Sequence, residues 1–447
     1  MLQAAQGSFP GLRHYALHHC GLASTLNNLS TKAKGKCYKA SFAVEAVFFG
    51  FLVGCKSATQ LAGFAKDLAE KKGAKLKGCR ATIKSLLSED RTVKELEIVL
   101  YKMIFQCRKK RVHKPSWSQG NVVVYVDGIY LQFMKEKHKD CKYCLKRVHN
   151  KGKENERVEY YHLGVSFSLS TDSGPIPIAF GLAEASSLPE GFENMTNDKQ
   201  KQEGEKSVTK RVLNDMAEYF GGSLPFDILA TDSLYPDAPF LELVESLGAC
   251  VVSGYKQKNR TLKKEAQRCF EGQCLGLDDV AKHSWDTDPS NSGRCFHSKT
   301  VVLSDKNRLG CDKDVIINET QRTERDGKEV KNTYMVSRNL KSTNLPKLLE
   351  NIRFHRWSHK ENGVFNQLTK NWNIFKHQFF HTSNAMLSIY RIMLLCLGVF
   401  NLYTNRNLCR RGRVFLSTVS SFFENILYSF KTMVKLTRYS FPIGKDP

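Results

Sequence analysis

Acidic residues are in short supply in this sequence, and so are long apolar runs. The 447 residues include 44 Asp and Glu against 68 Lys and Arg, which gives a formal net charge of +24. An excess of cations of this size raises the local concentration of polyanions, so it favours nucleic acid or an anionic membrane surface as the partner. A basic surface that is merely solvated is the alternative.

The two longest apolar segments are too short to cross a bilayer, whose apolar core is about 30 Å thick. They span residues 42–55 and 389–403, and charged Glu45 and Arg391 lie within them. The first residues, Met1-Leu-Gln-Ala-Ala, lack the charged start and continuous apolar core of a secretory signal. The 14 cysteines are scattered mostly singly, which favours reduced thiols over a disulfide framework. We therefore expect a soluble cytoplasmic protein that is not inserted in a membrane.

Hydrophobic periodicity predicts five parts along the chain. Residues 1–118 read as a helical region, with helices expected within 40–69 and 85–105. From 119 to 256 the expected order is strand 122–126, strand 159–169, strand 175–182, helix 206–220, strand 226–230, helix 238–247 and strand 250–255. This order predicts an α/β fold with a ribonuclease H-like core, a mixed sheet flanked by helices.

The remaining three parts complete that prediction. Residues 257–332 are polar with short strand-like pieces, and a bare loop of this length is disfavoured, so we expect an inserted β-rich subdomain. Residues 333–403 return a final strand and helices to the core. Residues 404–447 form a basic tail.

Three acidic residues lie in patterned segments far apart in the sequence. Asp127 ends one apolar run, Asp232 ends another, and Glu361 lies in a segment with helical periodicity. Carboxylates from two strand ends and a helix can hold two Mg²⁺ ions about 3.5–4 Å apart, which activates water for attack on a phosphodiester. Three such carboxylates would repel one another without a cation. Taken singly, each aspartate could instead cap a turn or a helix. Together with the basic charge, the set predicts a metal-dependent enzyme that acts on DNA.

Several segments between about 120 and 400 resemble the DDE transposases of bacterial insertion sequences, in the branch with a β-strand insertion before the last acid. Val124-Tyr-Val-Asp127-Gly128 is similar to the family's first-acid strand, and Asp232-Ser-Leu-Tyr235 with the later Lys256 is similar to its second-acid block. The segments similar to the strand and helix of the third block are Tyr334-Met-Val-Ser337, Arg356-Trp357, Glu361-Asn362, Phe365-Asn366, Leu368, His377 and His381.

This resemblance implies an enzyme that cleaves DNA at transposon ends and transfers the strand into target DNA. Two Mg²⁺ or Mn²⁺ ions would be bridged by Asp127 and Asp232, and Glu361 would hold one of them. The implied partner is double-stranded DNA, both transposon ends and target, bound by a homodimer that associates with the nucleoid. Region 1–118 would help to recognise the ends.

The third block departs from the family pattern in two ways. One residue more than usual separates Arg356 from Glu361, and Thr369 stands where a basic residue is expected. A catalytically inactive or domesticated DNA-binding descendant is therefore an alternative. A two-metal nuclease unrelated to transposition is another.

Four residues that flank the acids are predicted to contact DNA: Tyr235, Lys256, Arg356 and Trp357. Arg356 is expected to clamp a phosphate, because a guanidinium pairs bidentately with that group. The two aromatic rings could stack on an unpaired base, but they could equally be core residues.

A compact run of metal-binding residues lies between the first two predicted strands. His138, Cys141, Cys144 and His149 could form a Cys₂His₂ site for structural Zn²⁺. The alternative is a solvated basic loop with reduced thiols.

Overall fold

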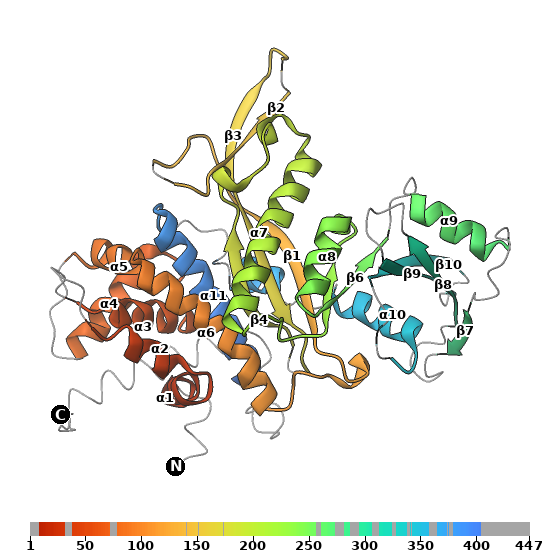
Figure 1. The fold of residues 1–447 in the computed structure, drawn as a ribbon. Helices are drawn as coiled ribbons and strands as arrows, with labels where there is room; N and C mark the ends of the chain where they lie inside the picture. The colour runs from red at the N-terminus through yellow and green to blue at the C-terminus, as the bar shows by residue number, and fades with distance from the viewer. Residues whose placement is uncertain are drawn as a thin grey trace.

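The computed structural model describes residues 9–31, 38–71, 78–139, 141–150, 152–172, 174–255, 261–272, 281–286, 295–305, 313–323, 328–337, 340, 342–356, 364–372, 374 and 379–403. These residues form a mixed α/β structure in which helices flank a ten-stranded sheet. In Figure 1 a helical region lies at one side, the central sheet stands in the middle, and the late strands form the other side.

The amino-terminal region is helical, as the periodicity predicts. Its α-helices are α1 (Phe9–His14), α2 (Leu22–Asn28), α3 (Ala40–Leu52), α4 (Ala58–Lys71), α5 (Cys79–Leu87) and α6 (Asp90–Lys109). One helix was expected over 85–105, but the structure has a break between α5 and α6. Ser88 causes this break locally, since its hydroxyl donates to the carbonyl of Lys84 (2.8 Å) and so caps the end of α5.

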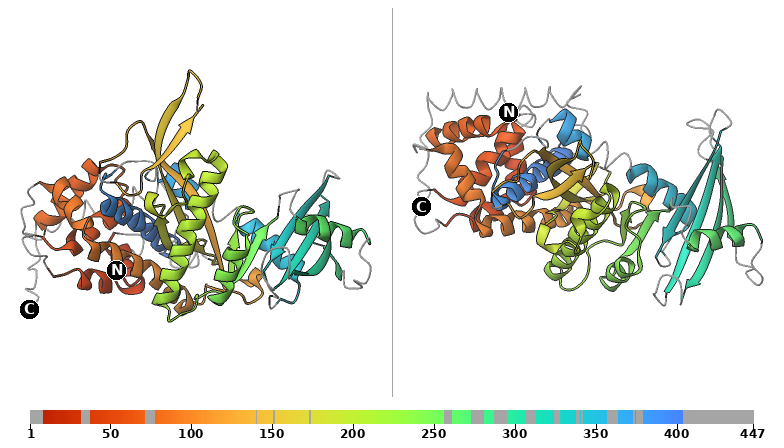
Figure 2. Two further views of the ribbon diagram at one scale, coloured as in Figure 1. Left: turned by 45° about the horizontal axis from the view of Figure 1, so that its top comes forward. Right: turned by 90° about the horizontal axis from the view of Figure 1, so that it is seen from above.

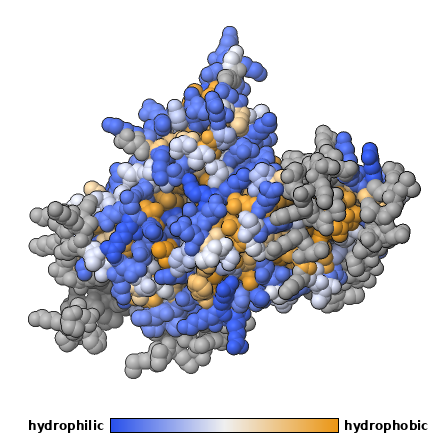
Figure 3. Space-filling model, in the orientation of Figure 1, coloured by the Kyte–Doolittle hydropathy of each residue, from blue (hydrophilic) through white to orange (hydrophobic). Residues whose placement is uncertain are grey.

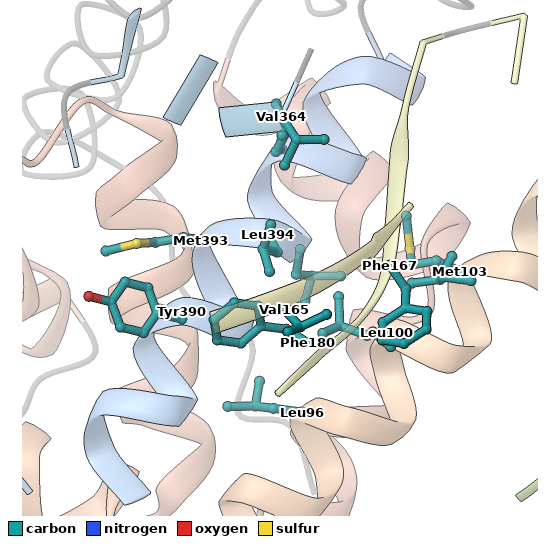
Figure 4. Packing of buried hydrophobic residues seen from close by; sticks show 14 of the residues in the cluster. Leu96, Leu100, Met103, Val165, Phe167, Phe180, Val364, Tyr390, Met393 and Leu394 are labelled. Carbon is teal, nitrogen blue, oxygen red and sulfur yellow. The ribbon is translucent and has the colours of Figure 1, made fainter. Parts of the chain in front are cut away.

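The centre of this helical region comes from the far end of the described chain. Helix α11 (Ser383–Tyr403) is long and apolar enough to cross a membrane by length and composition, but its apolar window is completely buried inside the protein. It packs against α3, α5, α6 and strand β4 (Ile176–Leu182). Figure 4 shows Tyr390 and Leu394 of α11 among side chains of α6 and β4. The helix is therefore the core around which the first helices assemble.

The sheet runs in the order β2-β3-β1-β5-β6-β10-β9-β8-β7, and β4 pairs with β3. Its strands are β1 (Val123–Met134), β2 (Leu145–His149), β3 (Arg157–Leu169), β4, β5 (Ile228–Thr231), β6 (Cys250–Gly254), β7 (Ala281–Asp286), β8 (Cys295–Asp305), β9 (Lys313–Thr323) and β10 (Glu329–Val336). Strands β1, β5 and β6 are parallel, whereas β3 and β10 run antiparallel to their neighbours β1 and β6. The ends of β2 and β3 project from the body as a hairpin, which Figures 1 and 2 show.

The helices between these strands cover opposite faces of the sheet. Helices α7 (Asn197–Tyr219) and α8 (Ala238–Ser246) connect β4 to β5 and β5 to β6. Helix α10 (Leu345–Arg356) packs on the other face, where its apolar residues join Val123, Tyr125, Ile228 and Ala230 in a separate buried cluster. The order of strands and helices from β1 to β6 agrees with the prediction, apart from the additional short strand β2.

The predicted insertion extends the core sheet. Strands β7, β8 and β9 form an antiparallel meander, and β10 joins that meander to β6. The insertion also contains α9 (Thr261–Phe270), a helix that the polar sequence did not indicate.

Candidate functional site

Asp127 lies within β1 and Asp232 directly follows the end of β5, on the same face of the sheet. Strands β1 and β5 are parallel, with Val123 opposite Ile228 and Tyr125 opposite Ala230. Continuing this register by two residues sets Asp127 opposite Asp232, on strands about 4.8 Å apart. Side chains at alternate positions share a face, and Tyr125 and Ala230 belong to the cluster under α10. Both carboxylates therefore project toward the α10 face.

Arg356, the last residue of α10, reaches the first of these acids. Its Nη2 lies 3.2 Å from Asp127 Oδ2, and both side chains are largely shielded from solvent. The other oxygen of Asp127 accepts a hydrogen bond from the backbone N–H of Gly128 (3.0 Å). The Arg356 guanidinium thus balances the charge of Asp127, the residue for which the sequence predicts a bound Mg²⁺ ion.

Asp232 is held through its backbone and one carboxylate oxygen. Its Oδ1 accepts from the N–H of Ser233 (2.6 Å), and its carbonyl accepts from the hydroxyl of Ser253 on β6 (2.8 Å). No ion pair involves Asp232 within the described ranges. Its second carboxylate oxygen is the ligand atom that fits a hard divalent cation.

A pocket of about 440 Å³ opens beside Asp232, at the carboxyl ends of β5 and β6. Its lining includes Asp232, Lys331, Arg353 and Arg356, so one acid faces three bases. The carboxyl ends of parallel strands are where ligands bind in open α/β sheets. The three basic side chains suit an anion, which could also contact a cation bound by Asp232.

A buried carboxylate missed by the sequence analysis lies on the other face of β1. Glu205 of α7 is 1% exposed and packs directly on Gly128, where an added Cβ would lie 2.1 Å from Glu205 Oε1. Lys201, one turn earlier on the helix, places its Nζ 3.5 Å from that same oxygen. Gly128 follows Asp127, so its neighbour Glu205 lies on the opposite face of the sheet from the Asp127 carboxylate.

Burial dominates the electrostatics of this second carboxylate. It raises the pKa of Glu205 to about 7, the Lys201 ammonium opposes that rise, and the nearby charge of Asp127 adds to it. Burial lowers the pKa of Lys201, but the combined attraction of Glu205, Asp127 and Tyr130 outweighs it, so the pKa is raised. Glu205 was missed because the predicted helix began at residue 206, whereas α7 begins at Asn197.

Tyr235, predicted to contact DNA, is instead a core residue. It is 1% exposed, and burial together with Glu205 raises the pKa of its hydroxyl well above the usual value. Its hydroxyl lies 3.5 Å from the Thr209 hydroxyl of α7. The ring therefore fixes α7 against the loop after β5, and the core interpretation of this aromatic is the correct one.

The described residues also exclude Glu350, the other acid near the Arg356-Trp357 pair, as a metal ligand of this site. Its carboxylate accepts from the Tyr334 hydroxyl (2.6 Å) and from Asn332 Nδ2 (3.2 Å), and it pairs with Arg353 (3.2 Å). These partners occupy the carboxylate within the α10–β10 contact. Glu361, Trp357 and Lys256, predicted as third acid and DNA contacts, lie outside the described residues.

The run of metal-binding residues after β1 gathers into a cluster, with one change of member. His138, Cys141, Cys144 and His162 bring their donor atoms within 4.8 Å of one another. His149, the predicted fourth ligand, lies at the other end of β2, where its Nε2 is 3.0 Å from Glu159 Oε2. The prediction is corrected at this position: His162 of β3 takes the place of His149.

No protein-family model matches the chain, and no curated protein sequence matches it. Among solved structures, the chain is similar to the piggyBac transposase in its cryo-EM synaptic complex with hairpin DNA. The TM-score is 0.40 and the sequence identity is 12%, over 96% of this chain and 82% of that chain. A likeness of this size establishes neither the family nor the activity of this chain.

Proposed function

We propose that this protein is a DDE-type DNA transposase with a ribonuclease H-like core, which cleaves DNA at transposon ends and joins the freed strand to target DNA. The observation that carries the proposal is the parallel register of β1 and β5, which, continued by two residues, sets Asp127 opposite Asp232 on the same face. The resemblance of the sequence segments to this family and the net charge of +24 support it.

The residues at this edge suit two-metal chemistry on a phosphodiester. Asp127 and Asp232 supply carboxylate oxygens, the ligands that Mg²⁺ and Mn²⁺ prefer. When bound, such ions polarise the scissile phosphate and lower the pKa of an attacking water. Glu361 is proposed as the third ligand on the resemblance alone.

Arg356 has a positioning role in this proposal. Its guanidinium pairs with Asp127, and it lines the same pocket as Lys331 and Arg353. These three cations would hold a phosphate group of the DNA beside the acids, since guanidinium and ammonium groups donate to phosphate oxygens. The DNA would be oriented by charge before any bond is cleaved.

Isosteric substitution of the acids tests the proposal. Asp127→Asn and Asp232→Asn should each abolish Mg²⁺-dependent cleavage of duplex DNA that contains the element's ends, because an amide is a poor ligand for Mg²⁺. DNA binding should persist, since the cationic surface is retained. Glu242→Gln, which removes an exposed carboxylate on α8, is the matched control and should cleave normally.

The outcomes separate the alternatives. Near-normal cleavage by either aspartate variant would remove that residue from the site. A native protein that binds DNA but never cleaves it would be a non-catalytic descendant. Cleavage without strand joining would indicate a two-metal nuclease unrelated to transposition.

A further inference from the structure

The strongest unassigned feature of the molecule is the cluster of two thiols and two imidazoles at the base of the β2–β3 hairpin. Cys141 Sγ and Cys144 Sγ lie 3.5 and 3.2 Å from His162 Nε2. In a tetrahedral zinc site, bond lengths of about 2.3 Å to sulfur and 2.0–2.1 Å to nitrogen place those donor atoms about 3.6 Å apart. The spacing of the donors is therefore already close to that of a zinc site.

The two histidines turn suitable nitrogens toward the same point. His162 directs Nε2 at both sulfurs. His138 uses Nε2 to contact His381 Nδ1 (3.1 Å), so its Nδ1 is the atom left for a metal. That Nδ1 is buried without a hydrogen-bond partner among the described residues. A buried unsatisfied nitrogen is costly, and coordination to a metal would satisfy it.

The cluster is fixed by elements from four parts of the chain. His138, Cys141 and Cys144 lie in the connection from β1 to β2, whereas His162 belongs to the central part of β3 and is fully buried. Lys142 lies inside the Cys-x-x-Cys turn, and its backbone N–H donates to the Ser383 hydroxyl at the start of α11 (3.1 Å). This hydrogen bond holds the turn in place. The carbonyl of Lys142 accepts from the N–H of Ala185 (3.0 Å).

We propose that His138 Nδ1, Cys141 Sγ, Cys144 Sγ and His162 Nε2 bind one structural Zn²⁺. Two soft sulfur and two imidazole donors in tetrahedral spacing are the set that zinc prefers over Mg²⁺ or Ca²⁺. Four protein ligands leave no position for a substrate, so the site is structural. Binding releases the thiol protons of Cys141 and Cys144 to solvent, because zinc coordinates thiolates.

His381 extends the site beyond its four ligands. A metal-bound histidine usually donates its other ring N–H to an acceptor that fixes the ring, and His381 Nδ1 is placed to accept from His138 Nε2. His381 lies two residues before the start of α11. The ion would therefore connect the hydrophilic hairpin seen in Figure 3 to the central helix of the amino-terminal region.

The main rival is a redox pair, since Cys141 and Cys144 form a Cys-x-x-Cys motif. That pair would need neither histidine and would cycle between dithiol and disulfide. The sequence-based rival is the same zinc site with His149 as the fourth ligand. Metal content separates all three, and it does so independently of DNA cleavage.

The experiment measures zinc per chain by mass spectrometry in the full-length protein, expressed with zinc and purified without chelator. The native chain should carry about one equivalent. Cys144→Ser and His138→Ala should each lose most of it, with the fold checked by circular dichroism. His149→Ala is the matched control and should retain it. His138 lies on a partly exposed connection, so loss of zinc in His138→Ala would not result from disruption of the core.

Cobalt gives a second, spectroscopic readout. Co²⁺ in the native chain should show tetrahedral d–d bands and a thiolate charge-transfer band, and the latter should weaken in Cys144→Ser. A folded native chain with no zinc, or one with a Cys141–Cys144 disulfide in its place, would overturn the proposal. Loss of zinc from His149→Ala with retention in His138→Ala would overturn the ligand assignment.

Discussion

Replacement of Glu205 by glutamine should change how the stability of the protein depends on pH. The carboxyl group is buried between α7 and Gly128, and its pKa is raised from the ordinary 4.5 to about 7, mainly by burial. At a pH between 4.5 and about 7, Glu205 is protonated in the folded chain and ionised in the unfolded chain. The stability contributed by the neutral acid is therefore complete below 4.5 and is lost as the pH rises through 7.

The size of the effect follows from the same two values. The interval from 4.5 to about 7, at about 1.4 kcal/mol for each pH unit, corresponds to about 3 kcal/mol. Glu205→Gln keeps the shape but cannot ionise. As the pH rises from about 4 to about 8.5, the native protein should therefore lose about 3 kcal/mol of unfolding free energy relative to the variant.

Urea unfolding followed by circular dichroism, in buffers with a chelator, measures this difference across the pH range. Glu203→Gln on the same helix is the matched control, since Glu203 is only partly buried, and its difference should stay flat. A flat difference for Glu205→Gln as well would refute the reasoning. It would mean that water reaches the carboxylate and that α7 does not pack closely over Gly128.

Three further predictions follow from contacts described above. Gly128→Ala should destabilise the fold by about 1–3 kcal/mol, because its Cβ would lie 2.1 Å from Glu205 Oε1; combined with Glu205→Ala the loss should be smaller than the sum, and additive losses would contradict the contact. Arg391→Leu should cost about 3–5 kcal/mol in thermal unfolding, since it leaves Glu97, its partner at 2.5 Å, without a counter-charge; unchanged stability would mean that the pair is solvated. The affinity for duplex DNA should fall with salt at a slope of about −0.9 per phosphate neutralised, and Arg356→Ala should reduce that slope by about 1; a slope near zero would remove nucleic acid as the main partner.

Much of the core sheet was predictable because its strands carry strong local patterns. The run Val122–Val126 is apolar throughout, as buried parallel strands require, and it predicted the start of β1. The pattern did not give the strand's far end, because Asp127-Gly128 interrupts the apolar run before the strand continues to Met134. Strand β2 was missed for a different reason. Its sequence, Leu-Lys-Arg-Val-His, is mostly basic and has no apolar alternation, and pairing with β3 makes it a strand.

The candidate site shows a similar division between local and long-range information. Asp127 and Asp232 were found because each ends an apolar run, and the parallel register then brings them together. Glu205 and His162 were missed because neither stands in a recognisable motif. His162 reaches the two cysteines through the pairing of β3 with β1, and no spacing along the chain encodes that pairing.

The position of α11 has a consequence for the order in which the chain can fold during synthesis. Helices α3, α5 and α6 emerge early from a ribosome, but the apolar helix that they enclose is made only after the whole sheet. Until then the early helices expose the surface that later covers α11, and such surfaces attract chaperones or other chains. A ribosome stalled before Ser383 would therefore carry an amino-terminal region without its central helix. Completion of this region is a late, long-range event, which slows folding compared with a helical bundle of neighbouring helices.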